Sequence, residues 1–209
     1  MMATGRHLGM IDLDVSRETI EKLEQFLALI KKWNTAINLV SKPSLAMAWD
    51  RHILDSAQIF SVTPESAIHF VDIGSGGGLP GIVLAVLSEE LAPDRRFTLV
   101  ESDQRKAAFL REASRALCLN LTVLSERADS ISPLGAEVLS ARAFAPLSQL
   151  LGTAQRHLLP DGCCLFPKGE SYMGEIDAAK KEWTFEYEAI TSKTDPRGAI
   201  LKIYGIQHV

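Results

Sequence analysis

Apolar residues recur at intervals of three and four early in the chain, between Ser16 and Ile37. This spacing predicts one amphipathic helix, because it places the apolar side chains on one helix face and the charged ones on the other. A second helix is predicted from Ser44 to about Phe60, with Ser44 as its N-cap directly after Pro43. The stretch Ser61–Ser66 is typical of a linker, so residues 1–66 are interpreted as an N-terminal helical extension.

From residue 67 onward, short apolar runs alternate with amphipathic stretches. The runs predict strands at Ile68–Ile73, Phe97–Glu101, Leu121–Leu124, Val138–Ala141 and Cys163–Phe166. The stretches between them predict helices that begin at Ile82 and that span Gln104–Leu117 and Leu147–Leu158. Strands that alternate with helices indicate a mostly parallel sheet with crossover helices.

The last part of the chain changes pattern again. A polar helical stretch, Glu175–Glu182, precedes two alternating segments, Phe185–Thr191 and Ala199–Ile206, with the turn residues Asp195–Gly198 between them. Two strands without a helix between them predict an antiparallel hairpin at one edge of the sheet. Residues 67–209 are therefore predicted to form an α/β core with a seven-stranded, Rossmann-like sheet.

The strongest local signal is the glycine-rich segment Val71–Gly81, which follows a predicted strand and precedes a predicted helix. Nucleotide-type cofactors bind at this kind of turn, at the carboxyl edge of an open sheet. The segment contains two overlapping patterns, the dinucleotide fingerprint Gly76-x-Gly78-x-x-Gly81 and the series Asp72-x-Gly74-x-Gly76-x-Gly78, which is typical of S-adenosylmethionine (SAM) binders. An NAD site and a SAM site are therefore both open.

Three carboxylates near this turn are candidate cofactor ligands. Asp72 is placed to pair with the ammonium group of SAM, which NAD lacks. Glu101, 20 residues beyond Gly81, is placed to accept from both hydroxyls of an adenosine ribose, which the two cofactors share. Asp129 is a candidate acceptor for the adenine amino group, with the Ala128 backbone against the ring edge. Glu101 therefore supports nucleoside binding without choosing between the cofactors.

Several longer blocks carry a more specific signal. They are Lys32–Ser41 (KWNTAINLVS), Arg51–Ser56 (RHILDS), Gly78–Gly81 (GLPG), Ser140–Phe144 (SARAF) and Pro167–Gly169 (PKG). Through these blocks the sequence resembles the bacterial RsmG (GidB) family, SAM-dependent methyltransferases that act on N7 of a guanine in 16S ribosomal RNA. The resemblance covers most of the chain, from about Lys31 to Gly169.

The resemblance implies a class I SAM-dependent methyltransferase core with an N-terminal helical extension. It implies SAM as the cofactor, S-adenosyl-L-homocysteine as the product, and SAM contacts at Gly74, Leu79, the Ala128–Asp129 pair and Arg142. Gly77 departs from the family, whose members often have proline there. We expect this glycine to loosen the loop slightly without changing the chemistry.

Methyl transfer from SAM is an in-line displacement in which the protein mainly aligns the reactants. Guanine N7 carries an in-plane lone pair, so no general base is required. Arg142 follows the fourth predicted strand. Its guanidinium is a candidate to bind the cofactor carboxylate, a substrate phosphate or guanine O6. Lys168 is a candidate phosphate contact, and Phe144 is a candidate for stacking on a base or a core residue. Arg142 and Lys168 are the two catalytic candidates.

One group of candidate RNA contacts lies in the second predicted helix. Arg51, His52 and Asp55 fall within one helical turn, and Arg51 and Asp55 have the spacing of a surface ion pair. The resemblance favours another interpretation, in which this helix lies over the cofactor pocket and helps to position RNA.

The charge balance argues against a surface that coats nucleic acid. The 209 residues contain 22 Lys and Arg against 26 Asp and Glu, a net charge of −4, whereas proteins that bind phosphates over their whole surface are basic. A local patch is needed, and Arg105, Arg111 and Arg115 on one predicted helix are candidates, or a solvated face. We expect weak, salt-sensitive binding to free RNA, and 16S rRNA in the 30S subunit or an assembly intermediate as the partner.

The remaining composition concerns the compartment and metals. Three cysteines without a C-x-x-C pair favour a reducing compartment. The sequence has neither a secretory signal nor a run of about 20 apolar residues that would span a membrane. The five histidines lack metal-ligand spacing. We expect a monomeric cytoplasmic protein without a metal or a membrane partner.

Three further functions stay open on the residues alone. A SAM-dependent methyltransferase of a small molecule is compatible with the acidic charge balance. An NAD-dependent oxidoreductase would use the fingerprint Gly76-x-Gly78-x-x-Gly81. A regulatory module would bind SAM without catalysis.

Overall fold

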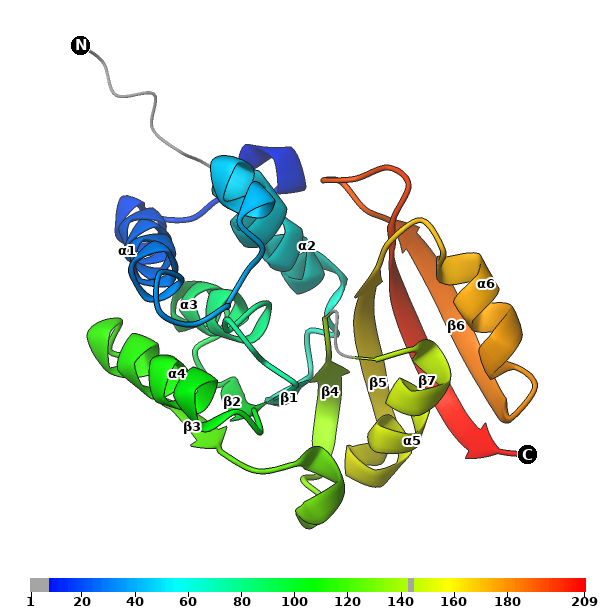
Figure 1. The fold of residues 1–209 in the computed structure, drawn as a ribbon. Helices are drawn as coiled ribbons and strands as arrows, with labels where there is room; N and C mark the ends of the chain where they lie inside the picture. Colours follow the sequence, from blue (N-terminus) through cyan, green and yellow to red (C-terminus); the bar gives the residue numbers. More distant parts are fainter. Residues whose placement is uncertain (1–7, 143–144) are drawn as a thin grey trace.

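Seven strands form one sheet at the centre of the structure, a computed structural model that describes residues 8–142 and 145–209 (Figure 1). The strands are β1 (His69–Ile73), β2 (Arg96–Val100), β3 (Leu121–Leu124), β4 (Ala136–Ser140), β5 (Leu158–Lys168), β6 (Trp183–Thr191) and β7 (Ala199–His208). Their order is β3-β2-β1-β4-β5-β7-β6. The first five run parallel, and β7 is antiparallel to both β5 and β6. The predicted fold class, with an antiparallel hairpin at one edge, is confirmed.

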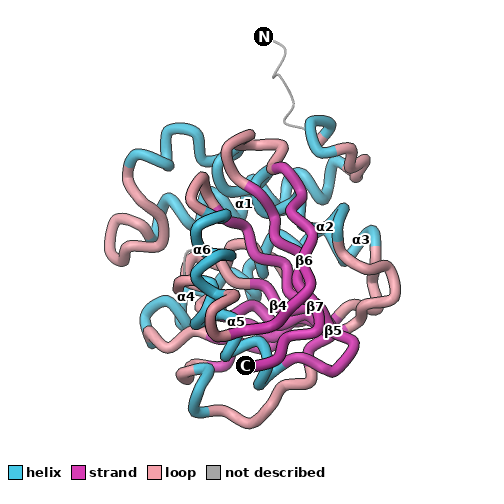
Figure 2. Tube along the Cα trace, turned by 90° about the vertical axis from the view of Figure 1, so that its right-hand side faces the viewer, coloured by secondary structure: helices cyan, strands magenta, loops and turns pink. Residues whose placement is uncertain are grey.

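Helices cover both faces of this sheet. They are α1 (Arg17–Trp33), α2 (Asp55–Val62), α3 (Gly81–Leu91), α4 (Gln104–Ala116), α5 (Leu147–His157) and α6 (Tyr172–Ala179). Shorter 3-10 helices span Gly9–Ile11, Pro43–Met47 and Ala128–Ser130, and a π-helical turn spans Trp49–Leu54. Helices α1 to α4 contribute buried residues to one apolar core and α5 and α6 to the other, and Figure 2 shows helices around the central strands. The chain therefore builds three layers with two apolar cores.

Strand β1 illustrates why the central strands are apolar at consecutive positions. The neighbours Phe70 and Val71 are 3% and 1% exposed, although they point to opposite faces of the sheet. Phe70 packs in the core of α1 to α4, with its ring 5.0 Å from that of Phe97. Val71 packs in the other core, together with Leu147 of α5. Strands buried on both faces need such continuous apolar runs, which made them predictable.

Helix α1 is shorter than its apolar periodicity predicted. It ends at Trp33 rather than Ile37, because the side chain of Asn34 bonds to the backbone beyond the helix. Its Oδ1 accepts from the amides of Leu39 at 2.8 Å and Val40 at 3.0 Å.

The predicted second helix is instead three short pieces, namely Pro43–Met47, Trp49–Leu54 and α2. In the π-helical turn three consecutive residues, His52, Ile53 and Leu54, are all buried. An α-helix at a core surface buries only a stripe, so the wider turn follows from tertiary packing rather than from local periodicity. Helix α2 also continues to Val62, into the predicted linker.

The N-terminal extension has no separate apolar core. Phe26 of α1 is fully buried and stacks on Phe109 of α4, with ring centroids 6.4 Å apart. Residues of the extension and of the sheet belong to the same buried cluster. The predicted boundary between residues 66 and 67 therefore marks a change in chain pattern, and its status as a domain boundary stays a prediction.

Helix α6 lies three residues earlier than predicted, at Tyr172–Ala179 rather than Glu175–Glu182. The last three residues of the predicted helix lead into β6, which begins at Trp183 with that side chain 7% exposed. Burial of the indole therefore sets where the helix must end.

Candidate functional site

The glycine-rich loop lies across the carboxyl ends of β1 and β2. The amide of Gly74 donates to the carbonyl oxygen of Val100 at 2.9 Å. Gly76 and Gly78 have φ values of 53° and 77°, in the region that favours glycine. A Cβ at Gly78 would lie 2.6 Å from Cγ1 of Ile82, whereas a Cβ at Gly76 would meet only the Gly74 oxygen, at 3.7 Å. The loop is thus packed tightly on α3 at one position and faces open space at another.

Asp72 lies beneath this loop. Its side chain is buried, and Oδ1 accepts from the hydroxyl of Ser140 at 2.7 Å. Its Oδ2 is buried without a hydrogen-bond partner among the described residues. Burial raises the pKa of Asp72 to about 6, and the hydrogen bond from Ser140 opposes this. The carboxylate lines neither of the clefts described below, so its pairing with a cofactor ammonium group stays a prediction.

The raised pKa of Asp72 predicts a pH-dependent stability. The folded state holds the proton more tightly than the unfolded chain, whose carboxyl has a pKa near 3.8. The contribution of Asp72 to stability is therefore greatest below pH 3.8 and falls as the pH rises through about 6, by about 2–3 kcal/mol. We therefore expect the difference in free energy of unfolding between Asp72→Asn and wild type, measured by urea titration, to shift in favour of the variant as the pH rises across this window. Parallel curves for the two proteins would contradict it.

Glu101 braces the loop from the end of β2. It is 7% exposed, and its Oε2 accepts from the amide of Gly76 while Oε1 accepts from the amide of Asp103, both at 2.8 Å. Each carboxylate oxygen keeps further acceptor capacity. The carboxylate therefore fixes the loop and can also accept from a hydroxyl group at this edge.

A cleft of about 830 Å³ opens at this edge of the sheet, and we call it the first cleft. Gly74, Val100, Ala128, Asp129 and Pro146 are among the residues that line it. The cleft therefore brings together Gly74 of the glycine turn and the Ala128–Asp129 pair, whereas the predicted ligands Gly76, Gly78 and Glu101 are not among its lining residues.

The Ala128–Asp129 segment is held by a residue that the sequence did not reveal. Nε2 of His157, in α5, lies 2.8 Å from the carbonyl oxygen of Ala128. Burial lowers the pKa of His157, which favours its neutral form. The Asp129 carboxylate is paired with Arg127 at 2.9 Å, which lowers its pKa. Leu79, by contrast, is 4% exposed and packs in the core on the α3 side.

A second cleft, of about 860 Å³, adjoins the first. Its walls come from the extension, the chain beyond β4 and β5, and the loop between β6 and β7. Among its lining residues are the predicted site residues Arg51, His52, Asp55, Arg142 and Lys168. Ala145 and Pro146 line both clefts, so this segment forms the wall where the two meet.

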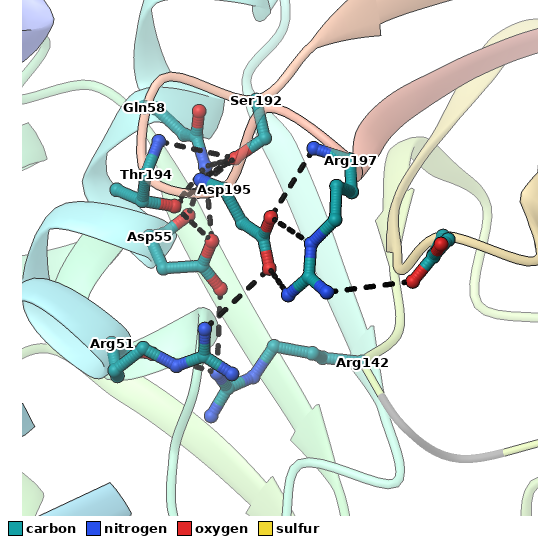
Figure 3. Close-up of polar contacts among 9 residues, drawn as sticks. Arg51, Asp55, Gln58, Arg142, Ser192, Thr194, Asp195 and Arg197 are labelled. Atoms are coloured by element: carbon teal, nitrogen blue, oxygen red, sulfur yellow. Dashed lines mark hydrogen bonds and ion pairs between the residues drawn. The ribbon is translucent and has the colours of Figure 1, made fainter.

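Asp55 joins the extension to the loop between β6 and β7 (Figure 3). Its Oδ1 accepts from the Thr194 hydroxyl at 2.7 Å and from Nε2 of Gln58 at 3.0 Å. Its Oδ2 lies 3.5 Å from Nη1 of Arg142. The sequence indicated only a turn near Thr194, and nothing in it placed that turn against the extension.

The ion pair suggested by the spacing of Arg51 and Asp55 is not formed. Arg51 pairs instead with Asp195 of the hairpin loop, with Nη1 and Oδ2 3.6 Å apart (Figure 3). The π-helical turn ends at Leu54, and its wider geometry does not stack residues four apart as an α-helix does. These two residues therefore serve different neighbours.

Arg142 is a largely buried cation beside the second cleft. Its Nη1 donates to the carbonyl oxygen of Arg51 at 3.4 Å and contacts Asp55, while Nε and Nη2 have no partner among the described residues. Burial lowers the pKa of its guanidinium, and the carboxylates of Asp55 and Asp72 oppose this. The side chain thus holds a positive charge and free donors at the second cleft.

His52 also lines the second cleft, where it is buried and neutral. It is 5% exposed, and its Nε2 lies 2.9 Å from the Ser44 hydroxyl. Burial and the nearby Arg142 lower the pKa of His52 to about 4. At neutral pH it therefore carries no charge with which to attract a phosphate.

Lys168 is also paired rather than free. Its ammonium group donates to the carbonyl oxygen of Ala145 at 3.2 Å and to Oε2 of Glu175 at 2.7 Å, and the side chain is 10% exposed. Glu175, in α6, was not a predicted site residue. Its partner lies seven positions earlier in a different element, beyond the reach of local spacing rules.

The predicted basic patch on α4 lies outside both clefts. Arg105 pairs with Asp103, Arg115 pairs with Glu112, and Arg111 donates to the carbonyl oxygen of Val123 at 3.4 Å. Arg115 lies about 15 Å further along the helix axis than Arg105, away from the carboxyl edge. RNA contact by this helix stays a prediction, and Phe144 lies outside the described residues.

Neither a metal-binding cluster nor a membrane-spanning helix is present in residues 8–142 and 145–209. Within these ranges, no three His, Cys, Asp or Glu side chains lie together as a metal site would require. The helices of the same ranges include none that is long and apolar enough to cross a membrane.

Residues 19–198 match the sequence model of one protein family, described as GidB, rRNA small subunit methyltransferase G. The chain is 52% identical to a ribosomal RNA small subunit methyltransferase G of Ruegeria sp. (strain TM1040), over the full length of both chains. It is 53% identical to a protein of the same name from Cereibacter sphaeroides (strain ATCC 17025 / ATH 2.4.3), over 94% of this chain and 95% of the relative.

Solved structures of other methyltransferases have the same fold at low sequence identity. Mitomycin 7-O-methyltransferase MmcR aligns with a TM-score of 0.58 at 15% identity, over 90% of this chain and 68% of its own. The ribosomal protein L11 methylase of Lactobacillus delbrueckii subsp. bulgaricus aligns with a TM-score of 0.56 at 15% identity, over 72% and 78%. The fold is therefore that of class I SAM-dependent methyltransferases.

Proposed function

The chain belongs to the rRNA small subunit methyltransferase G family, and from that premise we propose that it transfers the methyl group of SAM to N7 of a guanine in 16S rRNA. The observation that carries this proposal is the pair of clefts that meet at Ala145 and Pro146. One is at the nucleotide-binding edge of the sheet, and the other is large enough for a base. A transfer reaction needs two such sites with a shared boundary.

The first cleft fits the adenosyl part of SAM. Gly74 and the Ala128–Asp129 pair line it, and Glu101 ends the neighbouring strand with acceptor capacity for ribose hydroxyls. The open space at Gly76 lets the backbone approach a ligand closely. These features suit any adenosine cofactor, and family membership favours SAM over NAD. When bound, SAM supplies an electrophilic methyl group and leaves as S-adenosyl-L-homocysteine.

The second cleft is the proposed place of the target base. Three elements close around it, namely the extension, the chain beyond β4 and β5, and the hairpin loop. Arg142 lines this cleft, and the charge of Asp72 under the glycine loop opposes the lowering of its pKa. We propose that its free donors bind an anionic or carbonyl oxygen at the boundary of the two ligands, which aligns them. Arg142 is thus the catalytic residue of this account.

The reaction requires the protein to align the two ligands and does not require it to transfer a proton. Guanine N7 would supply its own lone pair, and bound SAM would supply the methyl group and retain the electron pair on sulfur, so the residues of the two clefts would hold and align the two ligands. His52 is neutral but hydrogen-bonded to Ser44 and buried, so no base is assigned. Orientation of two bound reactants contributes about 7–11 kcal/mol to such reactions.

The charges of the second cleft favour a folded ribosomal particle over free RNA as the substrate. Its cations Arg51, Arg142 and Lys168 each have a carboxylate partner, so few are available to neutralise phosphates. The net charge of −4 adds no long-range attraction. We propose that the protein acts in the cytoplasm as a monomer on the 30S subunit or an assembly intermediate, and that shape rather than charge guides docking.

Calorimetric titration tests the cofactor assignment. SAM and S-adenosyl-L-homocysteine are expected to bind in a one-to-one ratio, and NAD is expected to give no heat of binding. Binding of NAD without binding of either adenosyl compound would favour an NAD-dependent oxidoreductase instead. The absence of binding by either adenosyl compound would overturn the proposal.

A further inference from the structure

The wall between the two clefts is held in place from α6. Ala145 and Pro146 line both clefts, and the chain enters α5 directly after them, at Leu147. The carbonyl oxygen of Ala145 accepts from the Lys168 ammonium group at 3.2 Å. The amide of Leu147 donates to Oε2 of Glu175 at 3.1 Å. The segment is therefore tied at both ends to one half-buried ion pair.

Glu175 is the centre of this arrangement. Its Oε2 accepts both from Lys168 at 2.7 Å and from Leu147. The Pro146 N-cap of α5 makes no side-chain cap, and the first turn of α5 contains no acidic residue. A carboxylate from another helix thus satisfies the first free amide of α5, where negative charge is favourable.

The ion pair is also sheltered from solvent. The Lys168 side chain is 10% exposed and that of Glu175 is 27% exposed. With two hydrogen bonds from its ammonium group already made within the protein, Lys168 is directed at the wall rather than at solvent. This placement favours a structural use of the lysine over a direct phosphate contact.

We propose that Glu175 is a positioning residue for methyl transfer, which fixes the wall between the clefts through Lys168 and the Leu147 amide. The proposal rests on the assignment of cofactor and base to the two clefts. Glu175 also lines the second cleft, but its Oε2 already accepts from Lys168 and from the Leu147 amide. Its loss would therefore shift the wall and change the approach of N7 to the methyl group. Lys168 then acts with Glu175 as one unit rather than as an independent RNA contact.

The test is a double-mutant cycle with Glu175→Ala and Lys168→Ala, assayed with SAM and 30S subunits that lack the methyl group. Glu175→Ala is expected to lower kcat by about 10- to 30-fold, since small misplacements are costly in aligned reactions. KM for the 30S subunit and the calorimetric Kd for SAM are expected to stay within about threefold. The double variant is expected to be no slower than the slower single variant, because both changes remove the same unit.

Two further variants separate positioning from loss of fold. Glu175→Gln keeps an acceptor oxygen for Lys168 and Leu147, and it is expected to recover kcat to within about threefold of wild type. Asp177→Ala, on the same helix with an exposed side chain, is the matched control and should behave as wild type. Circular dichroism checks the fold of each variant.

Three results would overturn this proposal while the proposed function stands. One is a double variant whose fold-reduction in kcat equals the product of the fold-reductions of the two single variants. Another is an effect of Lys168→Ala confined to KM for the 30S subunit, which would assign the lysine to RNA. The third is wild-type kcat for Glu175→Ala. A wild-type protein that fails to methylate N7 would instead overturn the proposed function, and this inference with it.

Discussion

Replacement of Arg142 by alanine is expected to lower kcat/KM for methylation of 30S subunits by about 10²- to 10³-fold, equivalent to about 2.7–4 kcal/mol of transition-state stabilisation. The guanidinium is largely buried beside the Asp55 carboxylate, and it has donors free for a ligand. A preorganised, desolvated cation contributes more than a surface charge. Steady-state kinetics with labelled SAM measures the effect.

The matched control for Arg142→Ala is Arg96→Ala. Arg96 is exposed at the start of β2, so it lies at the opposite edge of the sheet from the clefts. This variant is expected to keep wild-type kinetics. Both variants should retain the circular dichroism spectrum of the wild type. Near-wild-type methylation by Arg142→Ala would show that the aligning group has been assigned to the wrong residue.

Substitution of Gly76 by alanine is expected to weaken SAM binding by about 10- to 100-fold, the equivalent of about 1.4–2.7 kcal/mol. A Cβ at this position would project into the open space over the loop, where the cofactor is proposed to approach. The φ of 53° adds strain for any residue with a Cβ. Calorimetric titration with SAM measures the change in Kd.

Gly205 in β7 provides a control with matched strain. Its φ is 58°, and a Cβ there would meet nothing within 4 Å. Gly205→Ala should therefore carry a similar backbone penalty and bind SAM as wild type does. Equal SAM affinity in Gly76→Ala and Gly205→Ala would contradict the proposal that SAM binds against the glycine loop.

The core of the fold was predictable because its signals are local. The central strands are buried on both faces, so they are continuous apolar runs such as that around Phe70 and Val71. The glycines of the loop are needed at positions such as Gly78, where a Cβ would clash with α3. Both requirements are visible in a short stretch of sequence.

The second cleft was less predictable because its contacts are distant in sequence. Asp55 is 87 positions from Arg142 and 139 positions from Thr194. The local spacing indicated a pair between Arg51 and Asp55, which the π-helical turn prevents. Glu175 could not be identified at all, since its importance comes from the wall it reaches rather than from its neighbours in the chain.

Methyl transfer to N7 of a guanine in 16S rRNA is tested most directly with 30S subunits from a strain that lacks this gene. The subunits are incubated with the protein and with SAM labelled in the methyl group. Borohydride and aniline treatment then cleaves RNA at N7-methylguanine. We predict label in 16S rRNA and cleavage at a single guanine. Label confined to a metabolite extract, or label in 16S rRNA without cleavage by aniline, would contradict the account.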